Sequence, residues 1–109
     1  MSPEIKKKWV EALRSGKYEQ ATGVLRSEDD CYCVLGVLYD VNNGKWKRSH
    51  NRWVSDRNHA SFSKSFQEEV GIPDDFVFDI ALMNDGNKGR KLKPIPFEDL
   101  ADYIEGVEI

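Results

Sequence analysis

Apolar residues near the start of the chain recur every four positions and predict a helix. Ile5, Trp9 and Leu13 lie on one helical face at this spacing. Ser2 is a typical N-cap residue, and Gly16 is a typical residue at which a helix stops. We therefore expect an amphipathic helix that buries Trp9 and ends near Gly16.

The most apolar part of the chain, residues 31–41, predicts a buried helix, with a buried strand as the alternative. Four apolar positions follow the spacing of one helix face: Val34, Val37, Leu38 and Val41. Gly36 lowers helix propensity here, and tight packing against another backbone would explain its presence. Residues 21–26 predict a short strand. Residues 45–61 have no clear period and predict a long loop, with or without a short hairpin.

The second half of the chain contains two helical patterns separated by an alternating one. Phe62, Phe66 and Val70 predict a helix that stops at residues 71–73. The period changes to two over residues 76–83, which predicts a strand, and residues 84–87 predict a turn. A last helix is predicted from the apolar face formed by Phe97, Leu100, Ala101 and Ile104.

These elements predict an α+β fold in one small domain, residues 1–109. Three to four helices would pack on a small antiparallel sheet. A chain of this length buries roughly two-thirds of its unfolded surface, which is enough for one core. We expect ten side chains to be buried: Trp9, Leu13, Val34, Val37, Leu38, Phe66, Phe78, Ile80, Leu100 and Ile104.

Composition and charge narrow the functional classes. Hydrophobic residues make up 39% of the chain and aromatic residues 11%, which predicts a folded protein. The formal net charge of −3 is mild and argues against a general nucleic-acid binder. The N-terminus has no apolar signal core, and no apolar run approaches the ~20 residues of a membrane helix. We expect a cytoplasmic protein with no membrane partner.

The two cysteines, Cys31 and Cys33, are separated by one residue and offer no disulfide framework. With His50 and His59 they make a conceivable zinc set, but their spacing does not suit common zinc modules. No nucleophile, phosphate-loop or metalloprotease motif occurs in the chain. We therefore expect reduced, metal-free cysteines, no cofactor and no enzymatic activity.

A basic segment with interleaved tryptophans, residues 45–59, is the strongest candidate for binding. A second basic cluster spans residues 88–93. Together they could hold phosphate groups beside stackable bases, if both lie on one face. The alternative is that the tryptophans fill the core and the charges only solvate a loop. The candidate binding residues are Lys45, Trp46, Lys47, Arg48, Arg52, Trp53, Arg57, Lys88, Arg90 and Lys91.

Four strings along the chain resemble small uncharacterised proteins of bacteriophages and prophages. They are Lys-Trp-Val-Glu-Ala-Leu-Arg-Ser-Gly from residue 8, Cys-Val-Leu-Gly-Val-Leu from residue 33, Asn-Asp-Gly from residue 84 and Phe-Glu-Asp-Leu-Ala-Asp-Tyr-Ile-Glu from residue 97. The resemblance implies a phage accessory protein acting inside a bacterium, where such proteins often block host or immune proteins.

Two functions are therefore expected. The first is a phage-type accessory protein that binds and inhibits a bacterial host or defence protein. The alternative is a binder that sequesters a phosphorylated nucleotide signal or another anionic ligand through the basic residues, with a homo-oligomer as an option.

Overall fold

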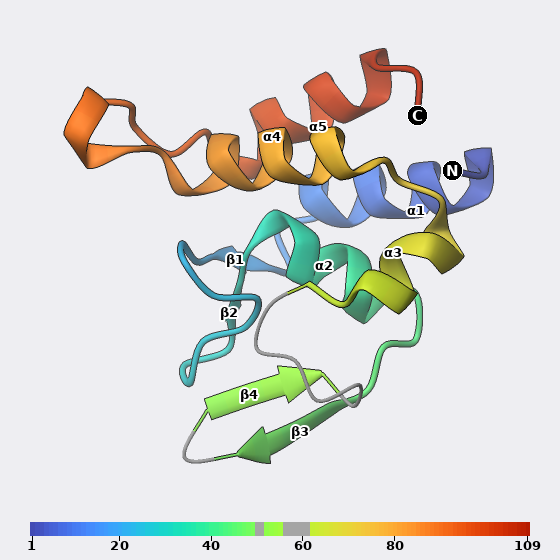
Figure 1. The fold of residues 1–109 in the computed structure, drawn as a ribbon, viewed down its shortest axis with the longest axis horizontal. Helices are drawn as coiled ribbons and strands as arrows, with labels where there is room; N and C mark the ends of the chain where they lie inside the picture. The colour runs from blue at the N-terminus through green and yellow to red at the C-terminus, as the bar shows by residue number, and fades with distance from the viewer. Residues whose placement is uncertain (50–51, 56–61) are drawn as a thin grey trace.

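The computed structural model describes residues 1–49, 52–55 and 62–109, and these form an α+β fold (Figure 1). The α-helices are α1 (Pro3–Arg14), α2 (Val34–Val41), α3 (Lys64–Val70), α4 (Asp74–Asp85) and α5 (Phe97–Gly106), and η1 (Lys88–Arg90) is a short 3-10 helix. β1 (Glu19–Gln20) pairs in parallel with β2 (Cys31–Tyr32), and β3 (Trp46–Ser49) pairs antiparallel with β4 (Arg52–Ser55). The predicted fold class is confirmed.

The core is centred on α2, whose residues 34–39 are all buried. Trp9 of α1 is fully buried, and its indole N–H donates to the carbonyl oxygen of Val34 at 2.9 Å. The ring of Trp9 also meets Phe76 of α4 edge-on. Nine of the ten side chains predicted to be buried are buried; the exception is Phe78.

Capping residues mark the start of α1 and both ends of α3. The hydroxyl of Ser2 accepts from the N–H of Ile5 at the start of α1, and the hydroxyl of Ser63 accepts from the N–H of Phe66 at the start of α3. Gly71 ends α3 in the left-handed conformation, with φ of 76°. These contacts satisfy backbone groups that a helix end leaves without an intrahelical partner.

The segment predicted as a strand over residues 76–83 is wrong, because it belongs to helix α4. Phe76, Ile80 and Asn84 are buried at four-residue spacing, whereas Phe78 is 69% exposed. Residues 76–83 alternate in the sequence because this helix carries apolar residues on two faces, one buried and one exposed. Pro73 and two aspartates in the first turn are typical of a helix start.

Two loop predictions also change in detail. The strand predicted over residues 21–26 is a loop, because Gly23 turns the chain with φ of 78° and only Arg26 forms a bridge, to Tyr32. In the segment 31–41 the helix begins at Val34, after the two strand residues of β2. The hairpin option for residues 45–61 is confirmed by β3 and β4, and residues 50, 51 and 56–61 lie outside the described part.

A buried amide, Asn84, ties the end of α4 to three other segments. Its carbonyl oxygen accepts from Gln20 Nε2 at 3.0 Å and from the N–H of Val34 at 3.1 Å. Its amide nitrogen donates to the carbonyl oxygen of Ala21 and to Asp85, both at 2.9 Å. All hydrogen-bonding positions of this amide are therefore used.

Gln20 extends this network to the last helix. Its amide nitrogen donates to the carbonyl oxygen of Ile95 at 2.8 Å, and its carbonyl oxygen accepts from the N–H of Phe97 at 3.1 Å. Phe97 is the first residue of α5, so Gln20 satisfies one of the free N–H groups at that helix start. The two amides thus join β1, α2, α4 and α5.

Gly36 allows α2 to approach the loop that precedes β2. A Cβ atom at this position would lie 2.0 Å from the backbone oxygen of Leu25, which itself accepts from the N–H of Cys33. The sequence-based explanation for this glycine, tight packing against another backbone, is confirmed. Within the described part of the chain, no helix has the length and apolar character needed to cross a bilayer.

We predict that Gly36→Ala lowers the free energy of unfolding by roughly 1–3 kcal/mol, because the added methyl group must displace backbone. Gly106→Ala is the matched control, since a Cβ there meets nothing within 4 Å. Urea denaturation followed by circular dichroism measures both. Equal stability of the two variants would contradict the close approach of α2 to Leu25.

Candidate functional site

The predicted basic segment forms a hairpin whose two key arginines point to opposite faces. Arg48 pairs with Trp53 across the strands, and Ser49 pairs with Arg52. Directly paired residues share a face, and successive pairs alternate between faces. Arg48 and Arg52 therefore do not converge on one ligand.

Arg48 is engaged within the protein. Its guanidinium lies 4.9 Å from the centre of the Trp53 ring and 3.4 Å from the carboxylate of Glu28. Arg52, on the other face, is exposed. Lys45 and Lys47 are exposed as well, whereas Arg57 lies outside the described residues.

The second basic cluster lies far from the hairpin. Figure 1 shows the orange segment around residues 88–93 at the upper left of the molecule, apart from β3 and β4 at the bottom. Arg90, Lys91 and Lys93 are exposed there, and η1 begins at Lys88. Among the described residues, the structure therefore does not bring the hairpin bases and the cluster at residues 88–93 together on a shared anion site.

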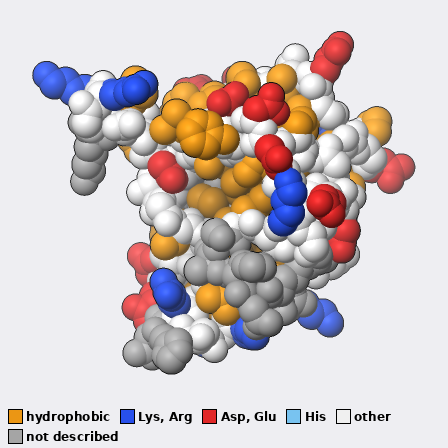
Figure 2. Space-filling view, in the orientation of Figure 1, with side chains coloured by type: hydrophobic (Ala, Val, Ile, Leu, Met, Phe, Trp, Pro, Cys, Tyr) orange, Lys and Arg blue, Asp and Glu red, His pale blue; other side chains and the backbone are white. Residues whose placement is uncertain are grey.

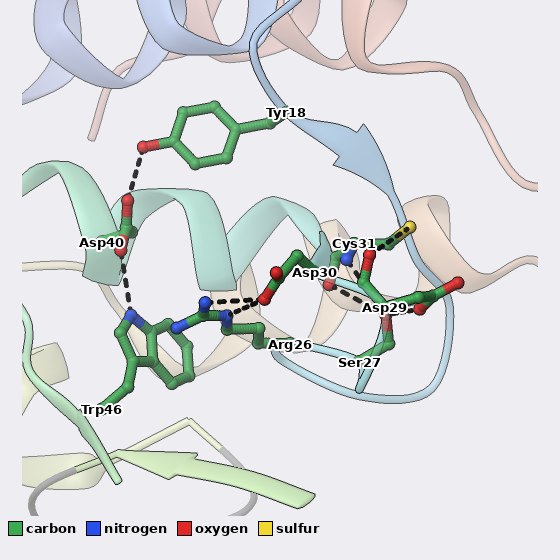
Figure 3. Close-up of polar contacts among 8 residues, drawn as sticks. All are labelled: Tyr18, Arg26, Ser27, Asp29, Asp30, Cys31, Asp40 and Trp46. Atoms are coloured by element: carbon green, nitrogen blue, oxygen red, sulfur yellow. Dashed lines mark hydrogen bonds and ion pairs between the residues drawn. The ribbon is translucent and has the colours of Figure 1, made fainter.

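The tryptophans of the hairpin pack around a different arginine, Arg26, which the sequence did not single out. Its guanidinium lies 3.8 Å from the centre of the Trp53 ring, 5.2 Å from that of Tyr32 and 5.5 Å from that of Trp46. It also forms two hydrogen bonds to Asp30, at 2.7 and 3.1 Å (Figure 3). Only 15% of this side chain is exposed, so the arginine attaches the hairpin to the rest of the protein.

Asp40 holds Trp46 from the other side. Its two carboxylate oxygens accept from the Tyr18 hydroxyl at 2.6 Å and from the Trp46 indole N–H at 2.9 Å (Figure 3). Burial and the hydrogen bond to Asp40 raise the pKa of Tyr18 well above its ordinary value. Trp46 also meets Tyr32 and Tyr39 edge-on, so its ring is part of the packing and is not a free stacking surface.

Cys31 is a half-buried residue of β2, and Cys33 is the buried N-cap residue of α2. The Cys33 sulfur accepts from the N–H of Gly36 at the start of α2, and burial raises the pKa of its thiol to about 11. Loss of solvent also raises the pKa of Cys31, whose sulfur lies 3.6 Å from Glu19. Both thiols are protonated at neutral pH, which does not suit a nucleophile. The described residues include no group of three metal ligands, and His50 and His59 lie outside them.

An apolar groove of about 700 Å³ lies beside α4, and the sequence prediction missed it. Its floor is formed by residues from the 23–25 loop, α2 and α4. Figure 2 shows hydrophobic side chains lining this hollow on the face of the molecule that carries α4. The apolar lining residues are Val24, Leu25, Cys33, Leu35, Phe62, Val77, Phe78 and Ala81.

Acidic residues border the groove. Asp74 and Asp85 lie at the two ends of α4, and Asp75 and Asp79 are exposed on the same helix. Asp74 is paired with Lys64 and accepts from Gln67 at 2.6 Å, contacts that hold its pKa below the ordinary value. Arg52 is the one basic residue among the described residues that line the groove.

Residues 1–93 match the model of a family described as a domain of unknown function, DUF8296. The chain belongs to this family. No curated protein and no solved structure matches the chain. Every residue that lines the groove falls inside the DUF8296 match, as do Arg26 and the hairpin, whereas α5 lies beyond it.

The groove of this DUF8296 protein could have been found only by assigning α4 as a helix. As a strand, residues 76–83 place Phe78 on the same face as Phe76 and Ile80, and therefore in the core. As a helix, they place Phe78 and Leu82 on the side away from Ile80, where both are exposed. The sequence does contain a signal for the start of this helix, namely Pro73 followed by Asp74 and Asp75 directly before Phe76.

We predict that Arg26→Ala lowers the free energy of unfolding by roughly 2 kcal/mol or more, because a largely desolvated cation–π contact and two charged hydrogen bonds are lost. Arg26→Lys should recover only part of this, since lysine lacks the planar fork. Thermal unfolding measures both. The control is Arg52→Ala, an exposed hairpin arginine, with an expected change within about 0.5 kcal/mol. If Arg26→Ala behaves like the control, Arg26 does not hold the hairpin in place.

Proposed function

We propose that this chain is a phage-type accessory protein that binds and inhibits a bacterial host or defence protein in the bacterial cytoplasm, without catalysis. The observation that supports this proposal best is the apolar groove with Phe78 on its edge. A phenylalanine that is 69% exposed, next to a concave apolar surface, is typical of a site covered by a partner. The resemblance of the sequence to small phage proteins is consistent with this role but names no target.

Three features favour a protein partner over a small ligand. Figure 2 shows the groove as a hollow at the surface of the molecule, whereas small-molecule sites bury most of their ligand. Exposed apolar side chains continue past it along α4 to Leu82, which is 38% exposed. Two carboxylates, Asp74 and Asp85, line the groove against one described base, Arg52, and carboxylates repel a phosphorylated ligand.

The alternative, a binder of a phosphorylated nucleotide, has less support. It was based on two basic clusters and two stacking tryptophans. The described parts of the two clusters lie apart in the molecule, Arg48 is paired with Glu28, and Trp46 is packed among tyrosines. Of the described candidate residues, the exposed bases of the hairpin would be left to bind a nucleotide, so we prefer the protein partner.

We predict that Phe78→Asp abolishes inhibition while the protein stays folded, because the side chain is exposed in the free chain but would be buried against a partner. Loss of such an anchor typically costs more than 2 kcal/mol of binding free energy. The chain is expressed in bacterial strains that each carry one defence system, and the plating of a phage that the system restricts is counted.

Leu92→Asp is the matched control for this experiment. Leu92 is 51% exposed but does not line the groove, so the same change in chemistry should leave inhibition intact. Wild-type levels of plating with Phe78→Asp would contradict the use of the groove. A wild-type chain that restores plating in no strain would contradict the proposed inhibition itself.

A further inference from the structure

We propose that the groove beside α4 binds an amphipathic helix of the partner whose apolar face is flanked by lysine or arginine. This inference rests on the proposed function and specifies the chemistry of the segment that is bound. It follows from the charges on α4, the helical character of most of the described groove lining, and the length of the apolar surface.

The charge pattern of α4 selects a basic partner. The helix carries four aspartates, at positions 74, 75, 79 and 85, and no lysine or arginine. Lys64 neutralises Asp74, which leaves Asp85 as the unneutralised acid that lines the groove. Asp75 and Asp79 add two exposed acids on the same helix, outside the groove lining. Asp85 accepts from the N–H of Gly23 and from Asn84, contacts that fix its carboxylate at the end of the groove. Basic side chains on either side of an apolar segment would complement this arrangement.

The same pattern disfavours a second copy of the chain as the occupant. Two copies packed through this face would bring their α4 aspartates together, and juxtaposed like charges at an interface cost free energy. The single described base that lines the groove, Arg52, is outnumbered by the acids of the partner copy. A heterologous partner of opposite charge avoids this repulsion.

The shape of the groove favours a helix over an extended strand. Most described lining residues belong to α2, α3, α4 and the loop at residues 23–25, and only Arg52 belongs to a strand. Strand addition needs an open row of backbone groups, which the helices that form most of the described lining do not offer. The edge strand β4 reaches the described lining through Arg52 alone. α4 has twelve residues and is therefore about 18 Å long, so three turns of a partner helix would cover it.

The apolar stripe on α4 matches the spacing of such a helix. Val77 and Ala81 lie one turn apart on the groove side, and Phe78 and Leu82 lie one turn apart beside them. A bound helix would place apolar side chains at i, i+3 or i+4, and i+7 against these four residues, which is the usual pattern of helix-in-groove recognition.

The test uses three synthetic 15-residue peptides labelled with a fluorophore. The first has leucines on one helical face and lysines elsewhere, the second replaces each lysine with glutamate, and the third scrambles the first so that no apolar face remains. Fluorescence anisotropy measures their affinities for the full chain, and backbone amide NMR shifts locate the binding site. We expect the first peptide to bind at least ten-fold more tightly than the other two, with shifts along α4 and residues 23–25.

Variants separate the apolar and the charged contributions. Phe78→Asp should lower the affinity for the basic peptide at least ten-fold, whereas Leu92→Asp should leave this affinity unchanged. The double change Asp75→Lys and Asp79→Lys should reverse the preference from the basic to the acidic peptide. Circular dichroism of each variant confirms the fold, since all four altered side chains are exposed.

Equal binding of the acidic peptide, equal binding of the scrambled peptide, or shifts confined to the hairpin or to α1 would overturn the inference. So would a dimer in sedimentation experiments that Phe78→Asp dissociates, since a second copy would then occupy the groove. If the basic peptide does not bind while Phe78→Asp still abolishes inhibition in cells, the proposed function stands and the inference of a basic partner helix is wrong. If the peptide binds as expected but no defence system is inhibited, the groove chemistry stands and the proposed function is wrong.

Discussion

Two amides, the buried Asn84 and the half-buried Gln20, fix the position of α4 against the start of α2 and the loop after β1, which form much of the groove. Between them they bond to the start of α2, the start of α5, the loop after β1 and the chain before α5. A buried amide that loses its partners costs about 1–3 kcal/mol per group, so α4 cannot rotate about its axis without a large penalty. With Asn84 held inward, Ile80 and Phe76 also face the core, and Phe78 must face solvent.

The exposed face of α4 is therefore a consequence of the network and not a defect of packing. A chain of 109 residues has a limited core, and leaving a phenylalanine and a leucine exposed gives up apolar burial that is worth roughly 25 cal/mol per Å². A surface of this kind is typical of a site whose burial is completed by a partner. The hairpin contributes in a different way: Arg26 attaches it among aromatic rings, and this leaves Arg52 at the groove.

Sequence patterns predicted most of the helices because their apolar residues have a single period. α1, α3 and α5 bury one stripe each, and serine caps mark the starts of α1 and α3. The α4 segment was assigned as a strand because it is apolar on two faces, which produces an apparent alternation along residues 76–83. The basic residues of the hairpin were visible in the sequence, but strand register decides which of them share a face. Arg26 was not predicted, because its role depends on three rings that approach it from separate segments.

The most direct test of the account is the solvent exposure of two phenylalanines on α4 in the free protein. A soluble nitroxide such as TEMPOL broadens the NMR signals of side chains that it can approach. If the amide network fixes α4 as described, the ring signals of Phe78 broaden strongly and those of Phe76, two residues earlier and buried, are protected. Equal protection of both rings would mean that the face is covered within the chain, and would contradict a preformed docking surface.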